Sequence, residues 1–455
     1  MASRPHPTEN EPADAAVDLL RSDDGPATVV RRAPFSDKPM VGARGQRTQQ
    51  RILDAALQVF GDEGYHQTSI ERITKQAGCS RASFYQYFSG KEDVFHQLTG
   101  QVARQLNAST EALGPLTPDH AGWVAIRAWV ARHADIHERY EPVFNAFQAA
   151  SEIDDQVAAG SARWSDRTLA RIRARLTTTA IPPRQLDSVI LLLMRCVTRT
   201  HEMASILRSA APDHYGEERV GDAMADIIHR VLFGLDEAVN VHSPERRRPP
   251  VLPFDPVVRD TVAKVERSTD LTPTGQQTLT ALLDAGREVF VRRGFHRTRI
   301  DDIVELAGLS HGAFYRYFDN KDQLARVLTT RAMSTVSQVL ADLPPAAELE
   351  GTAGRSALRR WLRRYNATQT DEAAMLRVSV DAALQDATLR ANSAPALDWG
   401  RRQMVGFLEP RGYGDLDNEA LVLVAVLSAF GSTPTSPAAA VDAAATVIEQ
   451  GFLDR

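Results

Sequence analysis

The sequence predicts an all-α protein composed of two similar units. A long segment of the chain occurs twice, and apolar residues recur at helical spacing through both copies. No stretch of any length alternates between apolar and polar residues as a strand would. A chain of 455 residues is also longer than one ordinary domain and agrees with several.

Composition excludes several classes of protein. Hydrophobic residues make up 43% and charged residues 24%, which is typical of a globular chain. The apolar runs are shorter than the roughly 20 residues that span a bilayer, and the first residues do not resemble a signal peptide. With only Cys79 and Cys196, no disulfide framework is expected. These features predict a cytoplasmic protein without a membrane partner. The net charge of −5 argues weakly against nucleic-acid binding, although a small basic footprint can lie on an acidic body.

The repeat joins residues 53–91 to residues 283–321 without a gap, and close to half of the aligned residues are identical. Such a match is not plausible by chance. Its period is far longer than that of a solenoid, so we interpret it as duplication of a whole domain.

The first helix of each copy is indicated by apolar residues at i, i+3, i+4, i+7 and i+8. In the first copy these residues are Ile52, Ala55, Ala56, Val59 and Phe60. Gly64 is expected to end this helix, because glycine adopts the left-handed conformation at low cost. Thr68 and Glu71 form a capping-box pattern that predicts a second helix, and Thr298 and Asp301 nearly repeat it in the second copy.

A third helix is predicted from Arg81 to Phe88, with Ser80 as its cap. Phe84 and Phe88 lie one turn apart and are expected to be buried, which leaves two tyrosines on the exposed side. A DNA groove with phosphates along its edges would explain such exposed aromatic side chains. Two short helices joined by a glycine turn therefore predict a helix-turn-helix that can enter the major groove.

These motifs resemble the DNA-binding domain of TetR/AcrR regulators. The resemblance rests on the Thr-Ser-Ile-x-x-Ile run from Thr68, on Ala77-Gly78-x-Ser80 and on the Phe-Tyr-x-Tyr-Phe-x-x-Lys run that ends at Lys91. The second copy matches from Thr298 through Lys321. Together the motifs cover about a quarter of the chain. Cys79 departs from the pattern, because the family usually has an aliphatic residue there, as at Leu309.

The resemblance implies a set of DNA contacts in each copy. Residues implied to contact phosphates are Thr68, Tyr85, Tyr87 and Lys91 in the first copy and Thr298, Tyr315, Tyr317 and Lys321 in the second. Residues implied to face bases are Arg81, Ala82, Ser83 and Gln86, and then His311, Gly312, Ala313 and Arg316. Ser80 and Ser310 complete the two recognition segments. Family members often use a basic arm before the first helix, which makes Arg44 and Arg47 further candidates.

The resemblance also implies that a larger helical domain for effector binding and dimerisation follows each DNA-binding domain. The resulting expectation is a disordered tail at 1–45, DNA-binding domains at 46–106 and 274–335, helical domains at 107–240 and 336–455, and a linker at 241–273. The closing helices of the first copy are expected at 187–207 and 219–236. Those of the second are expected at 419–430 and from Val441 to Phe452, and a short helix is possible at 256–266. The two units are hypothesised to pair within the chain, with pairing to another chain and further self-association as alternatives.

An unknown small-molecule effector is implied, and seven residues of the first helical domain are candidates for its pocket. They are Trp123, Trp129, His133, His137, Tyr140, Phe144 and Trp164. Core packing is an equally good account of the aromatic residues. The i, i+4 spacing of His133 and His137 could bind a metal, but no third ligand is evident, so neither a metal nor a cofactor is expected. For Cys79, filling the core is a better account than redox sensing.

Taken together, these features predict a DNA-binding transcription regulator, with ligand-controlled repression of an operator as the expected mechanism. Gln86 and Arg316 occupy equivalent positions and suit adenine and guanine respectively, so the half-sites of the operator should differ. No phosphate loop, nucleophile elbow or metal-ligand cluster indicates an enzyme. The alternative is a helical partner-binding or architectural protein in which one helix-turn-helix is vestigial.

Overall fold

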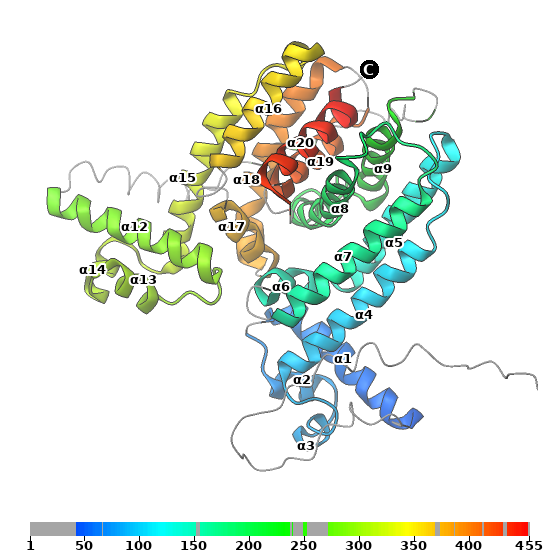
Figure 1. Ribbon diagram of the computed structural model, residues 1–455. Coiled ribbons are helices and arrows are strands. Elements are labelled where there is room, and N and C mark those ends of the chain that lie inside the picture. The colour runs from blue at the N-terminus through cyan, green and yellow to red at the C-terminus, as the bar shows by residue number, and fades with distance from the viewer. Residues whose placement is uncertain are drawn as a thin grey trace, which may run out of the picture. The chain divides into compact units, whose positions relative to one another are not determined.

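The computed structural model describes residues 42–65, 67–151, 155–236, 239, 249–252, 272–368, 374–385, 387–411, 414–430 and 435–453. These ranges contain helices and one isolated β-bridge between Leu116 and Leu176, which confirms the predicted all-α class (Figure 1). Most of the expected tail and linker, including the short helix at 256–266, lies outside the described residues. No helix in the described ranges has the length and apolarity needed to cross a membrane.

Each repeat contributes a similar series of helices. The first has α1 (Ala43–Glu63), α2 (Ile70–Gln76), α3 (Arg81–Phe84), α4 (Lys91–Glu111), α5 (His120–Arg139), α6 (Glu141–Ser151), α7 (Asp155–Arg175), α8 (Leu186–Arg208) and α9 (Glu217–Phe233). The second has α12 (Pro273–Arg293), α13 (Ile300–Ala307), α14 (His311–Tyr317), α15 (Lys321–Ala341), α16 (Gly351–Thr368), α17 (Ala374–Gln385), α18 (Ala387–Leu408), α19 (Leu416–Ala429) and α20 (Pro437–Ile448). Short turns η4 (Ala346–Glu348) and η6 (Glu409–Arg411) follow α15 and α18, and η8 (Glu449–Leu453) follows α20.

Several helix bounds differ from the sequence-based expectation. α1 begins at Ala43, inside the expected tail, so Arg44 and Arg47 belong to its first turns and not to an arm before it. The expected boundaries at 106/107 and 335/336 fall inside α4 and α15, so one continuous helix crosses each of them. The four closing helices lie close to their expected positions.

Contacts divide the chain into two compact units. The first covers residues 1–59 and 68–98, and the second covers residues 60–67 and 99–455. In the first unit the apolar stripe of α1 is buried, as are Ile73 of α2 and Phe84 of α3. Gln76 of α2 donates a hydrogen bond of 2.7 Å to Gln58 of α1. Gln49 of α1 donates one of 2.8 Å to Gln97 of α4.

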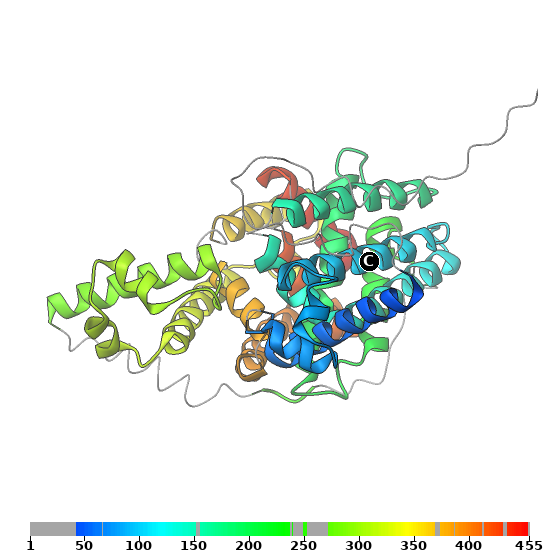
Figure 2. The ribbon, with the colours of Figure 1, turned by 90° about the horizontal axis from the view of Figure 1, so that it is seen from below.

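Within the second unit, α12–α15 form one lobe with its own apolar core (Figures 1 and 2). Leu282, Phe290, Phe314 and Leu324 are almost fully buried there. Met375 and Ala382 of α17 belong to the same core. The lobe of α12–α15 is therefore packed directly against α17.

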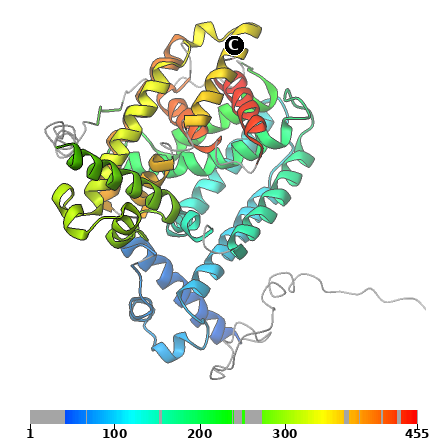
Figure 3. The ribbon, with the colours of Figure 1, turned by 60° about the vertical axis from the view of Figure 1, so that its left-hand side comes forward.

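The largest core of the second unit combines both repeats. Helices α8 and α9 contact α19 and α20, as Figures 1 and 3 show from two sides. Val197 and Ile227 of the first repeat share this core with Val426 and Val447 of the second. The apolar faces of these helices pack against one another, so each helix shields the apolar side chains of the other from water.

Polar contacts cross the same boundary between repeats. The Arg219 guanidinium lies 2.8 Å from the Asp415 carboxylate, and Thr446 donates a hydrogen bond of 2.9 Å to Gln185. A described piece of the expected linker is also held, because the amide of Leu252 donates to the Asp398 carboxylate at 3.1 Å. The two repeats are thus joined by ion pairs and hydrogen bonds as well as by apolar packing.

Candidate nucleic-acid interface and ligand sites

In the first unit, Ser80 caps the predicted recognition helix as expected. Its hydroxyl accepts a hydrogen bond of 3.1 Å from the amide of Ser83. The α-helix ends at Phe84, shorter than predicted, and the residues up to Tyr87 continue as a turn. Gly78 has φ +60° in the turn before it, a conformation that glycine adopts without a side-chain clash. In the second repeat, α14 runs through Tyr317 and has Ser310 as its cap.

The start of the preceding helix differs from the prediction in both repeats. Ser69, and not Thr68, is the cap of α2, because the Thr68 side chain is buried while the Ser69 hydroxyl accepts from the amide of Arg72 at 3.3 Å. In the second repeat Arg299 occupies the cap position. Its amide donates to the Asp302 carboxylate at 2.9 Å, so the expected Thr298 and Asp301 are displaced by one residue.

The recognition segments present their polar side chains to solvent. Phe84 and Phe88 are buried as predicted, and so are Phe314 and Phe318. Exposed residues of the two segments are Arg81, Ala82, Tyr85, Gln86, His311, Gly312, Tyr315 and Arg316. Ser83, Tyr87, Ala313 and Tyr317 are partly buried. The sequence predicts that both tyrosines of the first segment are exposed. Tyr85 is 42% exposed and Tyr315 is 55% exposed, whereas Tyr87 and Tyr317 are partly buried.

The exposed side chains differ in their intramolecular partners. Arg81 lies 3.5 Å from the Glu71 carboxylate, and Nε2 of His311 lies 2.5 Å from the Asp301 carboxylate. The described residues offer the guanidinium of Arg316 no ion-pair partner. Arg316 is therefore the arginine of the two recognition segments whose guanidinium forms no ion pair within the described part of the chain.

Lys91 and Lys321 make equivalent contacts below the recognition segments. Nζ of Lys91 donates to the carbonyl of Thr68 at 3.1 Å, and Nζ of Lys321 donates to that of Thr298 at the same distance. Burial lowers the pKa of both lysines. Tyr317 likewise donates to the carbonyl of Gly275 at 3.0 Å. The two lysines hold the turn before α2 or α13 in place, and Tyr317 contacts the first turn of α12. Contact of these side chains with DNA stays a prediction.

The effector candidates of the first repeat fall into two groups. Nε1 of Trp123 donates to the Asp226 carboxylate at 2.7 Å inside the core, and Gln105 donates to the hydroxyl of Tyr140 at 2.9 Å. In the other group, the ring of Trp129 stacks on His133, and the ring of Phe144 contacts both His133 and His137. Trp164 is partly buried, and its indole nitrogen has no partner among the described residues.

The structure adds His201 of α8 to the histidines, with its ring 5.8 Å from that of His133 and 5.9 Å from that of His137. All three side chains are buried. Burial lowers the pKa of His133 to about 3 and that of His137 to about 4, and it lowers the pKa of His201 as well. No trio of histidine, cysteine, aspartate or glutamate in the described ranges is arranged to hold a metal ion. Sequence spacing could not reveal His201, because only the packing of α5 on α8 brings it there.

Cys79 is partly buried in the turn before α3, and burial raises the pKa of its thiol. Cys196 is fully buried in α8, and burial raises its thiol pKa still further. A raised pKa disfavours the reactive thiolate, so both environments suit packing better than redox chemistry.

Two capped, glycine-linked helix pairs with exposed polar faces define a protein with two helix-turn-helix domains. Residues 52–98 and 282–328 each match the family described as bacterial regulatory proteins, tetR family. The chain thus carries two tetR-type domains in tandem.

Three named relatives each match part of the chain. The fatty acid metabolism regulator protein of Bacillus subtilis is 44% identical over 60 residues, which cover 12% of this chain and 31% of that protein. The regulator AcrR of Shigella flexneri is 42% identical over 53 residues, which cover 12% and 25%. The repressor AcnR of Corynebacterium glutamicum is 24% identical over 136 residues, which cover 28% and 70%. The chain thus spans a third or less of the first two relatives.

Proposed function

We propose that this protein is a sequence-specific DNA-binding transcription regulator that acts as a ligand-responsive repressor. The observation that carries the proposal is the pair of recognition segments, each capped by a serine and each exposing polar side chains around a buried phenylalanine pair. The relatives described above are named as regulators, and one of them as a repressor. Such a role requires access to the bacterial chromosome and hence a cytoplasmic location.

The operator in this proposal has two dissimilar half-sites. Gln86 and Arg316 are both exposed at equivalent positions of the two segments. Arginine can donate two hydrogen bonds to guanine, whereas glutamine pairs most naturally with adenine. One chain with two unlike segments would therefore prefer an asymmetric operator over the palindromes that suit identical subunits.

Pairing of the two repeats within one chain would provide both segments at once. The shared core of α8, α9, α19 and α20 and the ion pairs across it support this arrangement. A tether makes such pairing intramolecular, with an effective concentration on the order of millimolar. Light scattering of the full chain should then give about 50.0 kDa. A mass of twice that value that persists on dilution would instead indicate pairing between chains.

The test of the regulator role is selection of genomic DNA fragments with the full protein, followed by footprinting at two salt concentrations. A protected site with two dissimilar halves and an affinity that falls steeply as salt rises is expected, because phosphate contacts release counterions. The exposed pair Arg81 and Arg316 should be replaced by alanine in a control protein, which should lose the selected site. Absence of any selected site would contradict the regulator role, and protection of one half alone would favour the alternative with a vestigial unit.

A further inference from the structure

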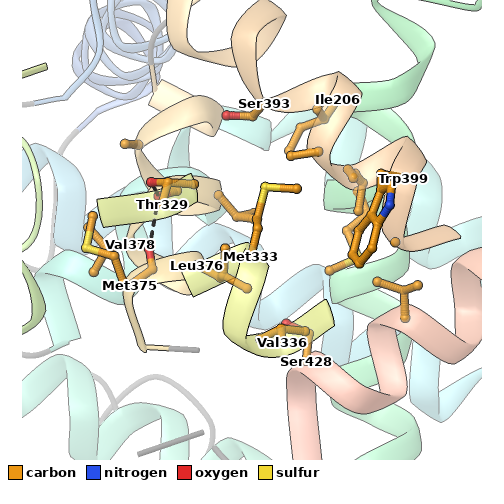
Figure 4. A pocket seen from close by; sticks show the side chains of 18 of the residues that line it. Ile206, Thr329, Met333, Val336, Met375, Leu376, Val378, Ser393, Trp399 and Ser428 are labelled. Atoms are coloured by element: carbon orange, nitrogen blue, oxygen red, sulfur yellow. Dashed lines mark hydrogen bonds between the residues drawn. The ribbon is translucent and has the colours of Figure 1, made fainter. Parts of the chain in front are cut away.

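A cavity of about 210 Å³ lies in the helical domain of the second repeat. Figure 4 shows Met333 of α15, Leu376 of α17 and Trp399 of α18 around one space, together with Ile206 of α8. Most of its wall is apolar. An apolar cavity of about 150 Å³ can hold a benzene molecule, so this one accommodates a larger apolar group.

The wall of this cavity is completed by the first repeat. Arg199, Met203 and Ile206 all belong to α8 and line it opposite the helices of the second repeat. Arg199 is already engaged, because it lies 2.8 Å from the Glu202 carboxylate and donates to the hydroxyl of Ser428 at 3.2 Å. A molecule in the cavity would therefore touch both repeats at the place where they pack together.

One cationic side chain in the wall has a buried donor atom that meets no acceptor among the described residues. Arg326 of α15 lines the cavity, and its Nε atom is excluded from solvent without a hydrogen-bond partner among the described residues. Asp322, one turn earlier, also lines the cavity. It lies beside Lys321, and its charge raises the pKa of that lysine, while burial lowers the same pKa by more. A buried donor without an acceptor is costly, and a carboxylate on a ligand would satisfy it.

The cavity also reaches the DNA-binding lobe of the second repeat. Phe295, which lies between α12 and α13, is part of its wall, and so are five residues from the first half of α15. The Lys321 ammonium lies 4.6 Å from the centre of the Phe295 ring, and it donates to the carbonyls of Phe295 and Thr298. The segment that leads into α13 and the recognition helix α14 is thus held by Lys321, which contacts the wall residue Phe295 and precedes the wall residue Asp322.

From these contacts we infer that the second repeat binds a compact apolar carboxylate in a site shared with α8, and that this ligand acts on the second recognition helix. The carboxylate pairs with Arg326, and the apolar part fills the space between α8, α15, α17 and α18. Occupancy alters the packing of Phe295 and α15 and thereby the position of α14. The inference extends the proposed regulator function, since it names the class of effector and the half-site that it controls.

Binding is tested first without DNA, using decanoate and decan-1-ol as matched probes on the full protein. Decanoate should raise the unfolding temperature in proportion to occupancy, and calorimetry should give its affinity. Arg326→Gln should weaken decanoate binding roughly tenfold or more and leave decan-1-ol binding unchanged, because it removes a charged hydrogen bond. Arg331→Gln is the matched control, since Arg331 lies on the same helix but is exposed. Equal weakening by both variants, or no binding of decanoate, would overturn the inference.

The location of the probe is tested by filling the cavity. Ala396→Phe and Val424→Trp each add bulk to its wall from a different helix, and each should weaken both probes at least tenfold. Circular dichroism identifies a variant that fails to fold, and the other variant then serves. Undiminished binding in a folded variant would place the probe elsewhere and overturn the inference.

The action on DNA is tested separately. Decanoate should slow amide exchange between Phe295 and Thr298, and it should change protection of the Arg316 half-site while the Gln86 half-site keeps its affinity. Equal changes at both half-sites would overturn the one-sided coupling. If the protein binds no operator, the regulator role fails, whereas the probe measurements made without DNA still decide whether the site exists.

Discussion

The Arg230 guanidinium in α9 lies 2.8 Å from the Glu419 carboxylate in α19, and both side chains are 2% exposed or less. The pair links the last helix of the first repeat to a closing helix of the second. Charges are expensive to remove from water, so each of these side chains depends on the other. The relationship gives the contact between repeats a specificity that apolar packing alone would not supply.

Arg230→Met should therefore lower the free energy of unfolding by about 3–5 kcal/mol, because it removes the guanidinium that faces the buried Glu419 carboxylate. Denaturant titration of the full protein measures the loss. The double variant Arg230→Met and Glu419→Met should recover most of the stability, since it removes both charges. Arg171→Ala breaks a far more exposed pair with Glu111 and should cost less than about 1 kcal/mol. Equal losses in the single and double variants would contradict this account of the pair.

Arg316→Ala should weaken binding at one half-site of the operator by about 1–3 kcal/mol, since a bidentate contact to guanine is lost. Gln86→Ala should weaken the other half-site. Quantitative footprinting separates the two effects. Arg355→Ala, at an exposed position of α16, is the control for loss of one positive charge and should change neither half. Equal weakening of both halves by Arg316→Ala would show that it does not read a particular base.

Gly122→Ala should be strongly destabilising. An added Cβ at Gly122 would lie 1.9 Å from the carbonyl oxygen of Thr117, so the backbone itself would have to move. Gly160→Ala is a matched change inside helix α7, where a Cβ meets nothing within 4 Å. That variant should gain about 0.5–1 kcal/mol, because alanine favours the helix over glycine. Thermal unfolding compares the two, and a tolerated Gly122→Ala would show that the start of α5 can shift.

Stability should fall in mild acid because of His133, His137 and His201. Their folded pKa values lie below the ordinary 6.5, so the unfolded chain binds more protons as pH drops below about 6.5. Each histidine contributes full stability above that pH and loses about 1.4 kcal/mol per pH unit down to its folded pKa. The cations Arg208 and Arg127 face the cluster and also disfavour protonation.

Replacing His133 or His137 by glutamine should reduce the pH dependence of the unfolding free energy between pH 6 and 5. The reduction should be about 1.4 kcal/mol per pH unit for each histidine replaced. Urea titrations at a series of pH values provide the measurement. His214→Gln is the control, because His214 lies outside the cluster. It shows how much the pH dependence of the unfolding free energy changes when a histidine elsewhere is replaced. An unchanged slope in both cluster variants would mean that the native state accepts the protons.

The DNA-binding segments were predictable in detail because their signals are local. Helical spacing, a glycine turn and a capping serine act within a few residues, and Ser80, Phe84 and Phe88 lie where the pattern predicts. The start of α2 was not predictable in the same way. Ser69 replaces Thr68 as its cap, and Thr68 is buried with its carbonyl accepting a hydrogen bond from Lys91, 23 residues away.

The sequence by itself determined an all-α protein with two tetR-type DNA-binding domains, because the repeat and its short-range patterns specify helices and turns directly. Only the tertiary structure joined His201 to His133, set Arg230 against Glu419, and enclosed a cavity between α8 and helices of the second repeat. These relationships depend on which helix faces pack together when the helices are far apart in the sequence. The apolar face of one helix could pack against that of many others. Shape and charge complementarity over the whole surface decide which helices pack together.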